Sequence, residues 1–297
     1  MMEDVRAAAA LSSYSVVTAA RNEAANLPRL AQSLMTQDVL PREWVIVDDG
    51  SDDETPQCIA QLAAELPWVR VLRGAGASTP TRGAPVAAAL QSGFAALAEP
   101  AEVVAVVDAD VSFDPTFFPR VLTAFADEPR LGIVSGARQE LRAGAWRRHF
   151  VTTPNVEAQC RAYRADCLAA VLPYEPHKGW DAVDVVRAVL GGWTTRVVDD
   201  AVFRHHRPVG ARDAGASAKW RVEGRAAHYL GYRHSYVLLR TLFHTRTDAA
   251  AMFLWVGYAG RALGRAPRCS DREVLAEVRR RQRLRELPQR LREVRGR

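Results

Sequence analysis

Two aspartates separated by one residue follow a short apolar run at residues 103–110, VVAVVDAD. In extended backbone, residues i and i+2 point to the same side, so Asp108 and Asp110 are expected to face one site together. Neighbouring carboxylates repel each other unless a cation or hydrogen-bond donors intervene. Mg²⁺ or Mn²⁺ bound with substrate phosphates suits such a pair, because Mg²⁺ takes one or two protein carboxylates and leaves its other positions to phosphate and water. The alternative is an acidic turn in solvent.

A second acidic cluster, DDGS at residues 48–51, ends another apolar run at residues 44–47. Asp48 or Asp49 has the acceptor oxygens to bind a nucleobase or a ribose, and the following glycine permits a sharp turn. The alternative is a strand-to-helix loop in which these residues cap the helix. Residues 21–23, RNE, follow the first apolar run and carry the same two interpretations.

Apolar runs alternate with helical patterns along the first half of the chain. Strands are expected at residues 14–18, 44–47, 69–72, 103–107 and 131–135, and helices at 24–35, after 52–53, at 85–97 and at 115–125. Strands separated by helical patterns of about 10–15 residues indicate βαβ units and a mainly parallel sheet. Such a sheet binds ligands beyond the carboxyl ends of its strands, and both acidic clusters fall there.

The alternation breaks after residue 136. Helices are expected at residues 155–171 and 181–190, and a strand at 194–198 leads to His205 and His206. Adjacent residues of a strand face opposite sides, so at most one of the two histidines is expected to reach a metal. The alternative is that both are ordinary histidines at a strand end, either exposed or hydrogen-bonded. From about residue 211 the pattern is helical and rich in arginine.

Two common nucleotide-binding motifs are absent. Gly74-Ala75-Gly76 begins like GxGxxG, but Thr79-Pro80 stands where the third glycine and the start of a helix should be. No GxxxxGK[ST] sequence occurs either. These absences argue against a nicotinamide dehydrogenase and against a P-loop NTPase.

Residues 15–51 resemble the opening of the family 2 glycosyltransferases, which have the GT-A fold. Three later segments match that family in order: RG at 82–83 with AAALQSG at 87–93, VDADV at 107–111, and GWDAVD at 179–184 with GW at 192–193 and HHR at 205–207 behind it. The resemblance covers about residues 13–210. It implies an α/β, Rossmann-like catalytic domain with a mainly parallel sheet flanked by helices, followed by a basic helical extension over 211–297.

The resemblance also implies roles for single residues around the donor. Thr18, Ala19 and Glu23 would line the nucleotide pocket, Asp49 would contact the base, and Arg82 would lie on the diphosphate side. Many relatives place a lysine after the glycine that follows Arg82, and this chain has an alanine there.

The resemblance also implies roles for residues close to the bond that breaks during sugar transfer. Asp108 would lie near the ribose, and Asp110 would bind the Mg²⁺ or Mn²⁺ that bridges the diphosphate. His205 would complete the metal or diphosphate site, and Asp181 would be the general base on the acceptor hydroxyl. A base on the face opposite the leaving group inverts the anomeric centre, by the logic that separates inverting from retaining hydrolysis of sugars. The alternative for Asp181 is a carboxylate that stabilises a helix N-terminus.

The implied activity is the transfer of a sugar from UDP- or GDP-sugar to a hydroxyl acceptor: a glycan, a lipid-linked sugar or a small molecule. One rival is a sugar nucleotidyltransferase, which would show a glycine-rich phosphate loop after the first strand, whereas residues 19–22 read AARN. The other rival is a non-catalytic protein that binds a nucleotide sugar. Such a scaffold would tolerate Asp181→Asn without loss of function.

The composition describes a protein with ample core. Of the 297 residues 48% are hydrophobic and 25% charged, which excludes wholesale disorder. The longest apolar run, residues 249–260, is too short for a spanning helix, which needs roughly 20 residues. The 4 cysteines lack CxxC spacing, so a reduced, cytoplasmic protein is expected. The abundance of arginine and alanine favours a bacterial source.

The basic charge of the chain belongs to its C-terminal end. Residues 261–297 hold 13 arginines against 5 acidic residues, whereas the whole chain carries only +6. An imperfect apolar stripe runs among these arginines: Val274, Val278, Leu284, Leu287, Leu291 and Val294. Such a segment suits an anionic membrane surface at the inner face of the cell membrane, or a helix docked on its own protein. Nucleic acid is not expected as a partner, because no recognised motif accompanies the charge.

Overall fold

The computed structural model describes most of the chain, in two compact units. The described residues are 13–74, 76, 83–98, 101–151, 154–207 and 215–283. The first unit extends to Trp180 and takes up the chain again at residues 187–207, while the second unit holds residues 181–186 and those after 207. The division thus passes through one helix. The predicted boundary at residue 210, between a catalytic domain and a helical extension, stays a prediction.

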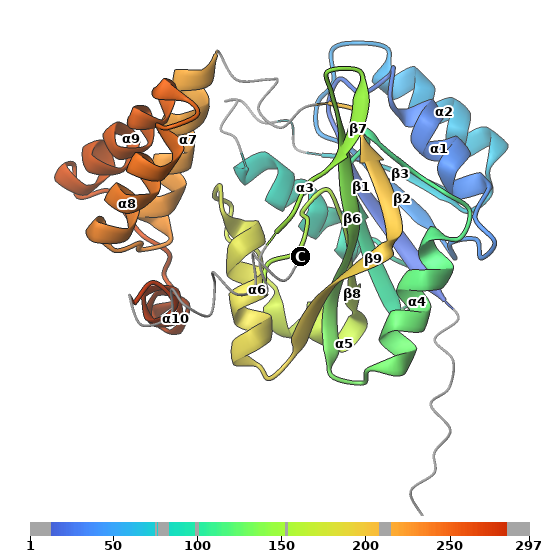
Figure 1. Ribbon diagram of the computed structural model, residues 1–297. Coiled ribbons are helices and arrows are strands. Elements are labelled where there is room, and N and C mark those ends of the chain that lie inside the picture. Colours follow the sequence, from blue (N-terminus) through green and yellow to red (C-terminus); the bar gives the residue numbers. More distant parts are fainter. Residues whose placement is uncertain are drawn as a thin grey trace, which may run out of the picture. The chain divides into compact units, whose positions relative to one another are not determined.

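Nine strands of the described residues form one sheet in the first unit (Figure 1). They are β1 (Tyr14–Ala20), β2 (Trp44–Asp48), β3 (Val69–Arg73), β4 (Val103–Val107), β5 (Val111–Phe113), β6 (Leu131–Arg142), β7 (Ala145–Arg148), β8 (Cys160–Arg164) and β9 (Thr194–His205). Their order is β3-β2-β1-β4-β8-β6-β9-β5, and β7 pairs with β6 outside this path.

The sheet is parallel in one half and mixed in the other. β3, β2, β1 and β4 pair in parallel. β8 runs antiparallel to both β4 and β6, β9 runs parallel to β6, and β5 runs antiparallel to β9. The expected α/β fold is confirmed. Four neighbouring strands, β3, β2, β1 and β4, are all parallel, while the other half combines the parallel pair β6 and β9 with antiparallel pairs.

The helix expected over residues 155–171 is wrong in its first part. Residues 160–164 form β8, and only α5 (Ala165–Val171) is helical. Cys160 and Ala162 lie in the core beneath the sheet, while Arg161 and Tyr163 point to the other face and are also buried. A strand buried on both faces does not show clear alternation, so pairing with two neighbouring strands decided its conformation.

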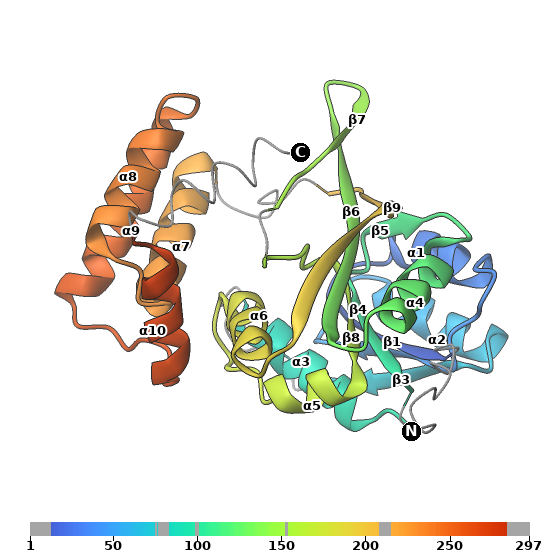
Figure 2. The same cartoon turned by 60° about the horizontal axis from the view of Figure 1, so that its bottom comes forward.

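Helices cover both faces of the sheet (Figures 1 and 2). The remaining helices of this unit are α1 (Leu27–Met35), α2 (Thr55–Glu65), α3 (Ala84–Ala95), α4 (Phe117–Asp127) and α6 (Trp180–Leu190), the last shared with the second unit. α1, α2 and α4 share one apolar core with strand residues such as Val16 and Ile46. α3 packs on the other face, where Gly93 lies so close to Val17 that any larger residue would collide with it.

The second unit is helical. It contains α7 (Ala216–Tyr229), α8 (His234–His244), a short 3-10 helix (Ala249–Ala251), α9 (Met252–Leu263) and α10 (Arg272–Arg281). α7 and α9 cross closely at Gly224 and Gly257, where a Cβ atom would collide with the backbone of the facing helix. No helix among the described residues has the length and apolarity to cross a membrane.

The described part of the C-terminal apolar stripe packs inside this unit. Val274 and Val278 of α10 are buried in a cluster with Tyr229 and Leu230. These two residues therefore follow the second alternative, a helix docked on its own protein. The other four residues of the stripe, from Leu284 on, lie outside the described residues.

Candidate active site

Acidic side chains gather where the parallel strands end. Asp48 is the last residue of β2, and Asp108 directly follows β4. Because β1, β2 and β4 are parallel neighbours, their carboxyl ends meet at one edge of the sheet. The sequence prediction of a shared edge is therefore confirmed by the topology.

Asp108, Asp110 and His205 form a cluster at this edge. One ligand atom from each lies within 4.8 Å of the others. The two aspartates occupy the turn between β4 and β5, where the Asp108 amide donates to the Gln159 carbonyl at 2.8 Å. β5 pairs with β9 so that Val111 lies opposite His205, which brings the imidazole to the aspartates across 95 residues of sequence.

Asp110 lies between an imidazole and a guanidinium group. His205 Nε2 is 3.3 Å from one oxygen of Asp110, and an Arg207 guanidinium nitrogen is 3.5 Å from the other. Arg207 also donates to both oxygens of Glu23, at 2.9 and 2.6 Å. The hydrogen bond to Glu23 raises the pKa of Arg207, so the guanidinium is a permanent positive charge here. Its charge makes this edge suitable for a diphosphate.

The two adjacent histidines point apart, as expected of neighbours in a strand. His206 Nε2 lies 2.7 Å from the Ser112 hydroxyl, and its ring contacts Trp146 edge-on. Burial, reinforced by Arg29, lowers the pKa of His206, which favours its neutral form. Of the pair, His205 is the residue that faces the aspartates.

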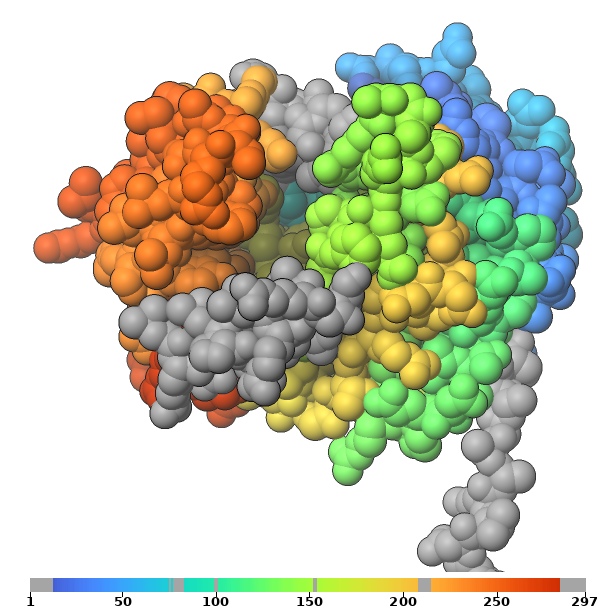
Figure 3. Space-filling model, viewed as in Figure 1, coloured from blue at the N-terminus to red at the C-terminus, as the bar shows by residue number. Residues whose placement is uncertain are grey.

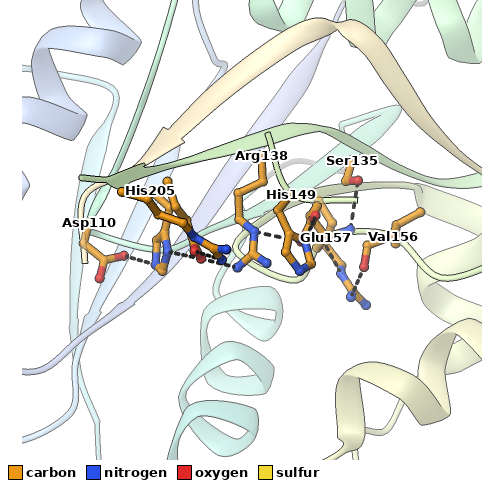
Figure 4. Close-up of polar contacts among 10 residues, drawn as sticks. Asp110, Ser135, Arg138, His149, Val156, Glu157 and His205 are labelled. Atoms are coloured by element: carbon orange, nitrogen blue, oxygen red, sulfur yellow. Dashed lines mark hydrogen bonds and ion pairs between the residues drawn. The ribbon is translucent and has the colours of Figure 1, made fainter. Parts of the chain in front are cut away.

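A row of buried charged side chains continues from His205 (Figure 4). His205 Nδ1 is 3.8 Å from Glu140, which is 3.0 Å from Arg138, which in turn is 3.1 Å from Glu157. His149 Nδ1 lies 2.7 Å from the other oxygen of Glu157. Arg138, Glu140 and Glu157 are at most 5% exposed.

Ion pairs hold this row together. Burial opposes ionisation of Glu140, but the Arg142 hydrogen bond and the Arg138 charge outweigh it, and the pKa of Glu140 is lowered. Charges so deeply buried persist only where opposite charges compensate them. The row therefore provides a fixed contact for the edge of the His205 ring that faces away from Asp110.

Asp48 and Asp49 have different surroundings. The Asp48 carboxylate accepts from the amide and the hydroxyl of Ser51, at 3.0 and 2.6 Å, and closes the turn. Asp49 is 9% exposed, and burial raises its pKa, with Arg21 acting in the opposite direction. Asp48 therefore closes the loop after β2 but does not cap α2, whose N-cap residue is Glu54. Asp49 stays the candidate for the nucleobase.

The other predicted pocket residues of β1 differ in exposure. Thr18 is fully buried, and its hydroxyl accepts a hydrogen bond from the Trp44 indole at 2.9 Å. This contact gives the Thr18 side chain a structural role, and contact with a nucleotide stays a prediction. Ala19 points to the other face of the sheet and is partly exposed. Glu23 is buried near Asp110 by its pairing with Arg207.

The predicted roles of two further residues, Arg82 and Asp181, stay predictions. Arg82 lies outside the described residues. Asp181 occupies the first turn of α6 and belongs to the second unit. Its role as the base stays a prediction.

Several residues that surround the cluster had no role predicted from the sequence. Arg207 was part of a matching segment but received no role, and Arg138, Glu140 and Glu157 received none. Arg138 and Glu140 lie two residues apart on β6, so they share one face of that strand. Extending the expected strand at 131–135 by seven residues would have placed both beside His205.

The hairpin formed by β6 and β7 continues beyond the sheet. Its two-residue turn, Ala143-Gly144, has positive φ at both positions, 49° and 76°. In the space-filling view the hairpin forms a ridge beside β9 (Figure 3). Leu141 of β6 is exposed, as is Phe150, which follows β7 by two residues.

Solved structures of glycosyltransferases share this fold. The mannosyltransferase PcManGT from Pyrobaculum calidifontis, in complex with GDP-Man and Mn²⁺, superposes with a TM-score of 0.55 at 15% identity, covering 89% of this chain and 78% of that chain. TarS 1–349 from S. aureus, in complex with UDP-GlcNAc, gives 0.58 at 18% identity, covering 93% and 88%. The fold is therefore that of a GT-A glycosyltransferase.

The sequence also shows which family of glycosyltransferases the chain belongs to. Residues 15–164 match glycosyl transferase family 2. The chain belongs to that family and is a glycosyltransferase. A curated relative, beta-monoglucosyldiacylglycerol synthase from Synechocystis sp., is 35% identical over 116 residues, which are 37% of this chain and 22% of that protein. The matched region thus spans about a fifth of the relative's length.

Proposed function

We propose that this glycosyltransferase uses a UDP- or GDP-sugar and a divalent cation, Mg²⁺ or Mn²⁺, and transfers the sugar with inversion to a hydroxyl acceptor. The observation that carries the proposal is the cluster of Asp108, Asp110 and His205 at the edge where the parallel strands end. Similar folds in complex with GDP-Man and Mn²⁺ and with UDP-GlcNAc support a nucleotide-sugar donor.

The residues of the cluster fit a divalent cation. Carboxylate oxygens suit Mg²⁺ and Mn²⁺, and an imidazole nitrogen is a common additional ligand. Asp110 and His205 are both less than 10% exposed, so their donor atoms are already withdrawn from most solvent. When bound, the cation would neutralise charge that develops on the departing diphosphate. Asp110 and His205 would hold it, with Asp108 towards the ribose.

The protein's own groups would carry the rest of the reaction. Asp49 would accept hydrogen bonds from the base, and Arg207 would add positive charge beside Asp110. Asp181 would take the proton of the acceptor hydroxyl as its oxygen bonds to the anomeric carbon. The bond from that carbon to the diphosphate oxygen breaks with its electron pair, and the nucleoside diphosphate leaves. General-base catalysis of this kind contributes about 10²–10⁴-fold.

Calorimetric titration of UDP and of GDP, with and without Mn²⁺, tests the donor site. We expect metal-dependent binding of one nucleotide to the wild type and its loss in Asp110→Ala. Asp181→Asn should keep this binding and lower the rate of sugar transfer by about 10²-fold or more, because it removes only the base. Metal-independent binding, or full transfer by Asp181→Asn, would contradict the respective assignment.

A further inference from the structure

Helix α8 presents a continuous apolar face to solvent. Leu238, Leu239, Leu242 and Phe243 are 44%, 50%, 55% and 60% exposed. Their spacing of i, i+1, i+4 and i+5 places them on one stripe of the helix. Val237 and Thr241, on the opposite side, are buried and attach α8 to its own unit. The four exposed side chains of the stripe are therefore not part of the core of this unit.

The unit that carries the stripe is strongly basic. α8 contains no acidic residue, and residues 215–283 carry 14 arginines and lysines against 5 acidic residues. The Arg246 guanidinium lies over the Phe243 ring, 4.3 Å from its centre, at the end of the stripe. Arg240 is 3.7 Å from Glu223 and is thus partly neutralised. An apolar stripe on a basic unit, with an arginine at its end, matches a surface with an apolar interior and anionic headgroups.

The same charge disfavours a second copy of the chain as the occupant. A symmetric dimer through α8 would bring two strongly basic units together and place like charges around one apolar contact. Anionic lipid instead neutralises the arginines while it takes up the leucines and the phenylalanine. The basic charge of the unit thus favours anionic lipid over a second copy of the chain. The apolar area alone does not distinguish these two occupants.

We propose that the α8 stripe docks the protein on an anionic lipid bilayer. Leu239, Leu242 and Phe243 insert at the headgroup boundary, and Arg246 pairs with lipid phosphate. The proposal differs from membrane binding through the C-terminal stripe, because Val274 and Val278 of that stripe are already buried within the unit. It is independent of the sugar-transfer reaction and stands whichever donor is used.

Flotation of the full chain with vesicles tests the proposal. Wild type should bind vesicles of phosphatidylcholine mixed with phosphatidylglycerol, and bind them more weakly in high salt or when phosphatidylglycerol is left out. The double variant Leu239→Ser/Phe243→Ser should bind at least about tenfold more weakly, because it removes apolar surface that enters the bilayer. Arg246→Glu, which leaves the apolar residues in place, should also weaken binding to the anionic vesicles.

A matched control separates the stripe from exposed apolar residues in general. Met35 and Leu40 of the first unit are 47% and 51% exposed, so Met35→Ser/Leu40→Ser makes a comparable loss elsewhere and should bind like the wild type. Unchanged binding by both α8 variants would overturn the proposal, as would absence of binding by the wild type. A wild-type dimer in solution that the double variant converts to monomers, with vesicle binding unchanged, would assign the stripe to a second copy instead.

Discussion

His205 occupies a position set by charges on both sides of its ring. One nitrogen faces Asp110, and the other faces Glu140, which Arg138 and Arg142 keep ionised. A carboxylate behind a metal-binding histidine orients the ring and strengthens it as a ligand. Nδ1 of His205 makes no hydrogen bond within the described residues, although Glu140 is only 3.8 Å away. We infer that Glu140 is a positioning residue whose contact with His205 matters most when a cation is bound.

Glu140→Gln tests this inference. Loss of the carboxylate charge should weaken Mn²⁺ binding by about 10-fold or more, the usual effect of removing a partner of a metal-binding histidine. Titration followed by electron paramagnetic resonance measures this affinity directly, without reference to activity.

Glu43→Gln is the matched control for that variant. Glu43 is a buried carboxylate of the same unit that accepts hydrogen bonds from Arg70 and from the Ala98 amide. Its substitution should destabilise the protein to a similar degree yet leave Mn²⁺ affinity unchanged. Equal Mn²⁺ affinities in the two variants would show that Glu140 acts on stability alone.

Strands β6 and β9 deliver the distant side chains to the site. They pair in parallel from Leu131 to Glu140, with a shift of register between Gly136 and Ala137. At Gly136 a Cβ atom would collide with the Ala201 carbonyl and with the Phe117 ring. Glycine therefore permits the two strands to approach at the irregularity, beyond which β9 continues to His205.

Gly136→Ala should disturb this pair of strands. Because one of the colliding atoms is backbone, β9 must move, and overpacking of this kind costs about 2 kcal/mol of unfolding free energy. Urea denaturation measures that loss, and Mn²⁺ binding should weaken with it because His205 shifts. Gly144→Asn, at a turn glycine with positive φ and open space around it, should change stability by only about 0.5 kcal/mol. Unaltered stability of Gly136→Ala would show that the strands can separate at no cost.

Over the whole molecule, separate apolar cores stabilise the two units. The core beneath the sheet has no residue in common with the clusters of the helical unit. Within the helical unit, α7 and α9 depend on the close crossing at Gly224 and Gly257. A substitution at that crossing is therefore expected to act on the helical unit first.

Gly257→Val should lower the unfolding temperature of the helical unit while the sheet unit keeps its Mn²⁺-dependent nucleotide binding. Differential scanning calorimetry should show this as a transition that moves to lower temperature, by several degrees for a loss of about 1–3 kcal/mol. Gly260→Ala, in the same helix with open space around it, should leave the transition in place. A single transition that moves as one in Gly257→Val would mean that the units unfold together.

Local sequence patterns were enough to predict the parallel half of the sheet and the acidic residues at its edge. Local signals suffice there, since each of these strands is a short apolar run followed by its own polar cluster, and parallel strands end at a common edge. Asp108, Asp110 and His205 could be named on this basis together with the family resemblance. The roles of Asp181 and Arg82 stay predictions.

The distant residues that complete the site come together through long-range contacts. The pairing of Glu23 with Arg207 joins positions 184 residues apart, and no local pattern indicates it. β8 became a strand because β4 and β6 offer it hydrogen bonds on both sides, although its sequence also fits a helix. Arg138 and Glu140 became buried because β6 continues past its apolar start. Long-range pairing and burial determine these features, and neither is encoded in the spacing of nearby residues.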